Sequence, residues 1–117
     1  MSSDRRPLYL VSLKVNPEKE VQFNQWYAER HIPRLLRYCP LFISAKRFRL
    51  ANDESAVSNQ DWPRYLTIYE LESDEVAERA LESMGVPDRE PDHQEWVDWQ
   101  PYLKEVEVDV FSQIYPG

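Results

Sequence analysis

The chain has 117 residues, which is long enough for one domain with a single hydrophobic core and too short for two. Hydrophobic residues make up 42% of it and aromatic residues 13%, a composition that is typical of a globular protein and argues against disorder. Fourteen Lys and Arg residues stand against 21 Asp and Glu residues, so the net charge of −7 repels nucleic-acid phosphates and anionic lipid headgroups. We therefore expect neither nucleic acid nor a membrane surface as a partner.

Rare residue types exclude further classes of protein. The single cysteine, Cys39, cannot form an internal disulfide, no apolar run reaches transmembrane length, and the polar segment 1–6 lacks the apolar core of a signal peptide. We therefore expect a cytoplasmic protein. Two glycines are too few for a phosphate-binding loop, and His93 in the sequence DHQEW has no second histidine cluster beside it. We predict no nucleotide, no metal and no other cofactor.

The first half of the chain alternates between strand and helix signals. Residues 7–15 alternate apolar and polar side chains and predict a strand. Asn16 is a good helix cap and Pro17 suits the first helical position, so a long helix begins there. This helix is expected to run to about Tyr38, because Pro40 disfavours the helical conformation of the residue before it.

A second strand is predicted at 41–51, followed by a polar loop at 52–63. Strict alternation would place these residues of the second strand on one face: Phe42, Ser44, Lys46 and Phe48. The β-branched and aromatic content of 64–72 predicts a third strand.

The second half repeats the strand and helix alternation. Ser73 caps a helix that is expected to end near Gly85. Residues 94–103 predict a short extra helix, and 104–116 predict a fourth strand.

The order strand, helix, strand, strand, helix, strand is that of the ferredoxin-like fold. We therefore predict one α+β domain over 1–117, with a four-stranded antiparallel sheet and helices on one face only. The other face of the sheet needs a cover, and a chain of this size has no third layer to supply it. A homodimer that packs sheet against sheet is the expected solution.

The long helix holds the main candidate for a functional residue. At about 100° per residue, one side of this helix carries these residues: Phe23, Asn24, Tyr27, His31 and Leu35. One interpretation of His31 is a core histidine that is hydrogen-bonded and inert. The other is proton transfer, because an imidazole beside a phenol and a carboxamide can move a proton at an activated carbon or hold an enolate.

Four aromatic side chains have a similar choice of roles. Trp26 lies at the edge of the buried helix face, where it either covers the rim of a cavity or lies in a subunit contact. Trp96, Trp99 and Tyr102 recur at helical spacing, and they either line one end of a ligand cavity or belong to the core.

The helix FNQWYAERHIPRLL at 23–36, the strand FISAKRFRLA after it and the segment RYLTIYELES together resemble the EthD-like branch of the dimeric α+β barrel superfamily. In that branch a helix with the pattern Phe-Asn-x-Trp-Tyr carries a histidine followed by a proline. The terminal VFSQIYP is similar to the last strand of such proteins, so the resemblance extends from about residue 8 to the end. Relatives include cofactor-independent monooxygenases, polyketide cyclases and muconolactone-type isomerases, which usually work in a cavity between the helices and the sheet.

This resemblance implies a catalytic role for His31 and Tyr27. The predicted substrate contacts are Phe23, Asn24, Trp26, Tyr69, Trp96, Trp99 and Tyr102. The resemblance also implies one exception to the absence of cofactors, since related barrels can bind haem and His31 would then be its axial ligand.

Two classes of function remain open from the sequence. The first is a small cofactor-independent enzyme that acts by proton transfer on an aromatic, polyketide-like or lactone metabolite, as an isomerase, cyclase or lyase, with a cofactor-free monooxygenase as a variant. The second is a non-catalytic dimer that binds a hydrophobic small molecule.

Overall fold

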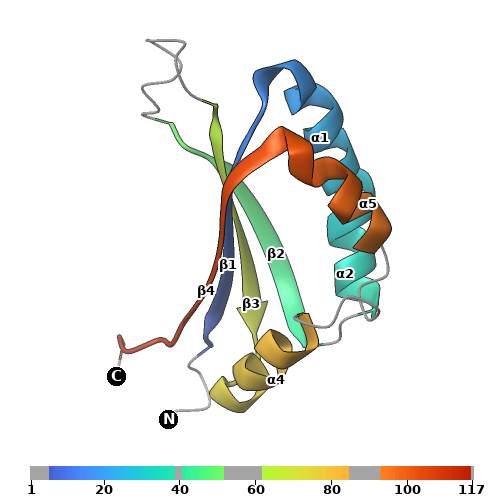
Figure 1. The fold of residues 1–117 in the computed structure, drawn as a ribbon. Coiled ribbons are helices and arrows are strands. Elements are labelled where there is room, and N and C mark those ends of the chain that lie inside the picture. Colours follow the sequence, from blue (N-terminus) through green and yellow to red (C-terminus); the bar gives the residue numbers. More distant parts are fainter. Residues whose placement is uncertain (1–5, 39–40, 52–61, 85–92, 117) are drawn as a thin grey trace.

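The computed structural model describes residues 6–38, 41–51, 62–84 and 93–116. Within them it has the predicted order of strands and helices, including the predicted short helix before the last strand (Figure 1). The elements are β1 (Leu8–Val15), α1 (Glu20–Trp26), α2 (Ile32–Tyr38), β2 (Phe42–Arg49), β3 (Arg64–Leu71), α4 (Asp74–Met84), α5 (His93–Trp99) and β4 (Leu103–Phe111). Cys39 and most of the predicted loop at 52–63 lie outside the described residues. The last strand ends at Phe111 and does not continue to residue 116 as predicted.

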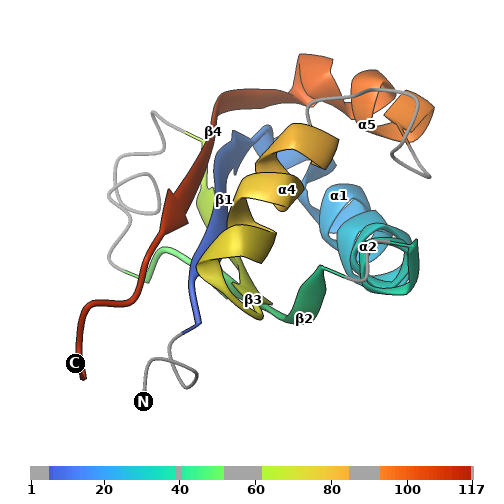
Figure 2. The ribbon, with the colours of Figure 1, turned by 90° about the horizontal axis from the view of Figure 1, so that it is seen from below.

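The four strands form one antiparallel sheet in the order β2-β3-β1-β4, which confirms the predicted ferredoxin-like fold. The helices lie on one side of this sheet, as Figure 1 and the perpendicular view in Figure 2 show. The central strands β1 and β3 bury the side chains that face the helices. Tyr9 pairs with Tyr69 and Leu13 pairs with Tyr65 across these two strands.

The predicted helix caps are present. The Asn16 side chain accepts a hydrogen bond from the Glu18 amide at 2.9 Å, and Pro17 opens a short 3₁₀ turn before α1. The Ser73 hydroxyl accepts a hydrogen bond from the Val76 amide at 3.3 Å at the start of α4. These local signals act within a few residues, which is why the sequence alone located both helix starts.

The long helix contains a π turn over Tyr27–His31, between α1 and α2. The Ile32 amide donates to the Tyr27 carbonyl five residues back. Pro33 follows directly, and proline has no amide hydrogen and crowds the carbonyl four residues before it. The wider turn accommodates that proline, and π turns of this kind are frequent at functional sites.

The predicted faces of β2 are wrong after its first residue. A register shift between Phe42 and Ser44 places Ala45 opposite Tyr69 and Arg47 opposite Thr67. Thr67 and Tyr69 are buried under the helices, so the side chain of Arg47 faces the helices, whereas simple alternation from Phe42 would put Lys46 there. Such a β-bulge adds one residue and reverses the alternation beyond it.

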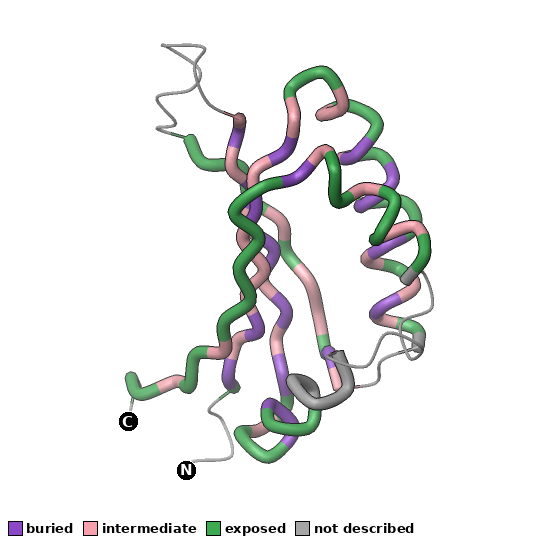
Figure 3. The backbone as a smooth tube through the Cα atoms, in the orientation of Figure 1, coloured by how far each residue is buried: buried purple, intermediate pink, exposed green. Residues whose placement is uncertain are grey.

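The core under the helices consists of two clusters at opposite ends of the sheet. One joins Tyr9, Leu35 and Tyr69 to Val76 and Ala77 of α4. The other joins strand residues to α1 and includes Leu13, Phe23, Trp26, Tyr27 and Tyr65. Strand β4 is mostly exposed along its length, as the green tube in Figure 3 shows.

Candidate active site

His31 lies on the buried side of the π turn, directly after Tyr27 on that side. Only 7% of its surface is exposed. The centroid of its ring lies 4.6 Å from the ring of Tyr27, 4.9 Å from Trp26 and 5.5 Å from Trp96. Aromatic packing therefore holds the imidazole in one orientation, pointing from the helix toward the sheet.

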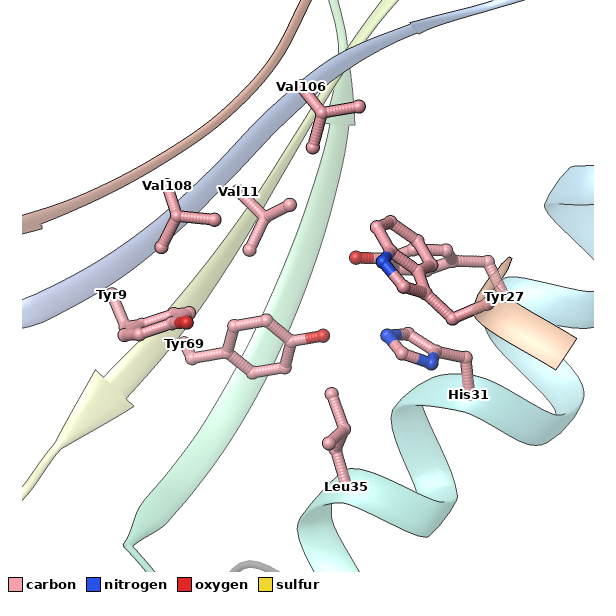
Figure 4. Close-up of a pocket in the computed structure, with 9 residues that line it drawn as sticks. Tyr9, Val11, Tyr27, His31, Leu35, Tyr69, Val106 and Val108 are labelled. Carbon is pink, nitrogen blue, oxygen red and sulfur yellow. The ribbon is translucent and has the colours of Figure 1, made fainter. Parts of the chain in front are cut away.

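A cavity of about 170 Å³ lies in front of His31, where the two core clusters meet. Its lining residues come from β1, the long helix, β3, α5 and β4: Tyr9, Val11, Tyr27, His31, Leu35, Tyr69, Trp96, Val106 and Val108. Figure 4 shows the hydroxyl of Tyr69 directed from the sheet toward the imidazole of His31, with Leu35 beside them. The structure thus brings four of the sequence-predicted site residues to one cavity: His31, Tyr27, Tyr69 and Trp96.

The hydroxyl of Tyr69 is the most unusual polar group of this cavity. The Tyr69 side chain is 1% exposed, and none of the described residues gives its hydroxyl a hydrogen bond of ordinary geometry. Burial raises the pKa of this hydroxyl well above its usual value, and the neighbouring Tyr27 raises it further. Tyr69 is therefore a neutral donor at physiological pH, available to an oxygen atom of a ligand.

The size of the cavity limits what it can hold. A cavity of about 150 Å³ accommodates a benzene-sized molecule, so 170 Å³ suits a single ring with one or two substituents. A porphyrin is far larger, so the site does not fit the haem that the family resemblance allowed. Val106 and Val108 line the cavity and yet are 43% and 45% exposed, which places its opening along β4.

Five of the seven predicted substrate contacts do not line this cavity, and four of these five are aromatic. Phe23, Trp26 and Trp99 belong to the core cluster next to it, where their rings pack against one another with centroids 5.3 to 6.0 Å apart. Tyr102 lies beyond Trp99, with the ammonium of Lys19 5.3 Å from its ring. Of these, Trp26 packs directly on three lining residues, Tyr27, His31 and Trp96.

Asn24 also lies away from the cavity, in a polar network between α1 and the sheet. Its amide nitrogen donates to the Tyr65 hydroxyl at 3.0 Å, and its carbonyl oxygen accepts from Arg47 at 2.6 Å. The Tyr65 hydroxyl donates in turn to the carboxylate of Glu20. Burial and the bond to Glu20 raise the pKa of Tyr65. Asn24 therefore positions Tyr65 and Arg47, and it does not line the cavity.

Glu95 fastens α5, and with it Trp96, to the long helix. Its carboxylate accepts hydrogen bonds from Trp26 at 3.0 Å, from Arg34 at 2.6 Å and from Arg30 at 3.2 Å. The bond from Trp26 and the charges of the two arginines lower the pKa of Glu95. The sequence alone did not identify this anchor, because the partners are more than 60 residues apart.

Arg47 is a second residue that sequence reasoning missed. Its guanidinium carbon lies 4.4 Å from the ring centroids of both Tyr27 and Tyr65. Burial lowers the pKa of this guanidinium below its usual value. The bulge in β2 removed the signal, because unbroken alternation puts Arg47 on the face of the sheet that carries no helices.

Two further classes of site have no support among the described residues. No three histidine, cysteine, aspartate or glutamate side chains gather there as metal ligands. No helix in the same part of the chain has both the length and the apolar character to cross a bilayer.

Comparisons with known proteins agree with this fold. Residues 6–85 match the family described as a domain of unknown function, DUF4286. No curated protein matches the sequence.

Solved structures with the same fold share little sequence with this chain. An ethyl tert-butyl ether d (EthD) family protein from Bacillus halodurans has 14% identity and a TM-score of 0.60, over 92% of this chain and 99% of that chain. SnoaB, a cofactor-independent oxygenase from Streptomyces nogalater, has 18% identity and a TM-score of 0.62, over 96% and 98%. A dimeric ferredoxin-like protein from an uncultured marine organism has 11% identity and a TM-score of 0.62, over 100% and 95%. The expected likeness to EthD-like and dimeric ferredoxin-like proteins is therefore confirmed for the fold.

Proposed function

The chain belongs to the DUF4286 family, and we propose that it is a small enzyme that needs no cofactor and moves a proton on a single-ring aromatic or lactone-like metabolite. One observation carries this proposal: the imidazole of His31 and the buried hydroxyl of Tyr69 converge on one cavity from opposite sides. A buried phenol that faces a buried imidazole across an unfilled cavity supports a functional role for both groups. The description of SnoaB as a cofactor-independent oxygenase is consistent with cofactor-free chemistry on this fold.

The proposed chemistry assigns one task to each polar group. His31 removes a proton from a carbon next to a carbonyl group, and later returns it to another position. The hydroxyls of Tyr69 and Tyr27 line the same cavity and donate hydrogen bonds to the carbonyl oxygen as it gains negative charge. The apolar side chains of Val11 and Leu35 line the inner part of the cavity and limit the access of water to the reacting carbon.

We further propose that the protein works as a homodimer through the helix-free face of the sheet. This face carries half-buried Leu10, Leu66 and Ile68, and Phe48, which is 48% exposed. Apolar surface of this kind on a central strand pair favours burial against a second copy. The fold neighbour from a marine organism is described as dimeric, which supports the same assembly.

Hydrogen exchange in heavy water tests the proton transfer without knowledge of the natural substrate. The probes are five-membered unsaturated lactones and small aryl ketones, whose loss of the proton next to the carbonyl is followed by NMR. We expect exchange with the unmodified protein, and a reduction of about 10² to 10⁴ in His31→Gln. Substitution of the other histidine, His93→Gln, is the matched control and should leave the exchange rate unchanged.

The competing proposal is a non-catalytic binding protein, which the mostly apolar lining of the cavity favours. It predicts that the same probes bind without exchange. Binding without exchange, or equal exchange rates for the unmodified protein and for a folded His31→Gln variant, would reject the proposed enzyme and support this alternative.

A further inference from the structure

Arg47 is half-buried, and none of the described carboxylates forms an ion pair with its guanidinium. Its Nη1 donates to the neutral carbonyl oxygen of Asn24 at 2.6 Å. Its Nε and Nη2 are both buried and have no hydrogen-bond partner. The nearby carboxylate of Glu20 accepts instead from Tyr65 and from Arg49.

This arrangement costs folding free energy, because a guanidinium stays charged in proteins and loses hydration when its nitrogens are buried. Cation–π contacts offset part of this cost: the guanidinium carbon lies 4.4 Å from the ring centroids of Tyr27 and Tyr65 and 5.4 Å from that of Phe23. A leucine or methionine at this position would fill similar space without that cost. The retained charge therefore indicates a use.

The ring of Tyr27 connects this charge to the cavity. It contacts the guanidinium of Arg47 on one side, and the same residue lines the cavity together with Tyr69. The guanidinium carbon is 4.4 Å from the ring of Tyr27, which is 1% exposed, so the field of the guanidinium is less screened there than in open solvent. Negative charge on an oxygen near the hydroxyls of Tyr27 and Tyr69 is stabilised as a result.

The other ionisable groups around Arg47 do not cancel this effect. Tyr27 and Glu20 face it from the long helix, and Tyr65 and Tyr69 face it from β3. The raised pKa values of Tyr65 and Tyr69 keep these two phenols neutral at physiological pH, and the carboxylate of Glu20 is already bound by Arg49 and Tyr65. The local balance of charge is therefore positive when the cavity is empty.

We propose that Arg47 is a positioning residue that makes this cavity select anions, so that a single-ring ligand binds with an ionised oxygen, such as a phenolate, an enolate or a carboxylate, at the hydroxyls of Tyr27 and Tyr69. The inference rests on the proposed function, since it assigns the charge of the substrate at the same site. The inference adds that the substrate is an acid, or becomes an enolate, at the hydroxyls of Tyr27 and Tyr69. An arginine that does not line the cavity determines this preference for negative charge.

The test uses p-nitrophenol, a single-ring acid whose coloured anion and nearly colourless neutral form differ in absorbance. Its methyl ether, 4-nitroanisole, has the same ring and cannot ionise. With the unmodified protein, we expect bound nitrophenol to be half ionised about one pH unit below the free compound, which is about a tenfold preference for the anion. Nitroanisole should bind more weakly than nitrophenol at the pH at which nitrophenol is ionised.

Substitutions separate Arg47 from its neighbours. Arg47→Met should abolish the preference for the anion, and Arg47→Lys should keep part of it because the charge remains. Lys46→Met is the matched control, one residue away on the same strand, and should keep the full preference because Lys46 is exposed and lies on the helix-free face of the sheet. If Arg47→Met does not fold, the comparison of Arg47→Lys with the unmodified protein still decides.

Several outcomes would overturn the inference. One is that neither probe binds, or that nitrophenol binds to the unmodified protein in its neutral form. Another is a preference for the anion that survives in Arg47→Met and disappears in His31→Gln, which would assign it to the imidazole. If nitroanisole binds as tightly as nitrophenol, the cavity does not select anions. That result would not affect the proposed proton transfer by His31, which the hydrogen-exchange assay tests separately.

Discussion

Two tyrosines on β3 form a matched pair for testing how this site is built. Tyr65 and Tyr69 lie four residues apart on the same face of the strand and are both buried, at 7% and 1% exposed. The hydroxyl of Tyr65 donates to Glu20 and accepts from Asn24. The hydroxyl of Tyr69 has no hydrogen bond of ordinary geometry from the described residues. We predict that phenylalanine at the two positions changes the free energy of unfolding in opposite directions.

The magnitude follows from these bonds. Tyr65→Phe removes a bond to a carboxylate and leaves the Asn24 amide without its acceptor, so it should destabilise the protein by about 2 kcal/mol. Tyr69→Phe removes a buried hydroxyl whose lost hydration costs about 1 to 3 kcal/mol, at the expense of a few van der Waals contacts of one oxygen atom. It should therefore stabilise the protein by about 1 kcal/mol. The two variants should differ by about 3 kcal/mol.

Urea unfolding followed by tryptophan fluorescence measures both changes, at one protein concentration because the proposed dimer makes the midpoint depend on it. The same variants are then assayed for exchange of the lactone and ketone probes. Tyr69→Phe should lose at least about tenfold in exchange rate despite its higher stability, because the hydrogen bond to the developing enolate is gone. A gain of stability with a loss of activity is typical of a residue that is retained for function.

Equal destabilisation by the two substitutions would refute this reasoning. It would mean that the hydroxyl of Tyr69 is fully hydrogen-bonded in solution, for example by an ordered water molecule in the cavity. A stable Tyr69→Phe variant with unchanged exchange would leave the stability argument intact and remove Tyr69 from the active site.

Three further predictions concern the acid response, the assembly and the absence of metal. The folded pKa of Glu95 is lowered, so its stabilisation of α5 is complete at neutral pH and is lost in acid, as the pH falls through that lowered value. Glu95→Gln should accordingly lower the melting temperature at neutral pH by only a few degrees, since the side chain of Glu95 is 35% exposed. In acid the variant and the unmodified protein should have the same melting temperature. An equal difference at both pH values would contradict this. Sedimentation at micromolar concentration should show a dimer and Ile68→Asp a folded monomer, whereas a monomeric unmodified protein would reject the proposed interface. Elemental analysis should find no stoichiometric transition metal, and one metal ion per chain would overturn that expectation.

The local signals in the sequence were sufficient for the fold. Helix starts at Asn16 and Ser73 depend on side chains that bond to amides two or three residues away, so the pattern predicts them directly. The spacing of Tyr27 and His31 likewise predicted that both face the sheet, and both are buried. The order of strands and helices then left the ferredoxin-like arrangement as the expected topology.

The candidate site depended on contacts that no local pattern encodes. A one-residue bulge in β2 decided that Arg47 and not Lys46 lies under the helices, because register is a property of the strand pair. The π turn before Pro33 and the ion pairs of Glu95 placed Trp26 and Trp96 around His31. The sequence by itself determined which residues alternate, cap and pack on one side of a helix, since those depend on neighbours along the chain. Only the tertiary structure decided that Tyr69 faces His31 across a cavity. Their relative position depends on the register of β3 in the sheet, on how the long helix packs over it, and on the small volume that this packing leaves unfilled.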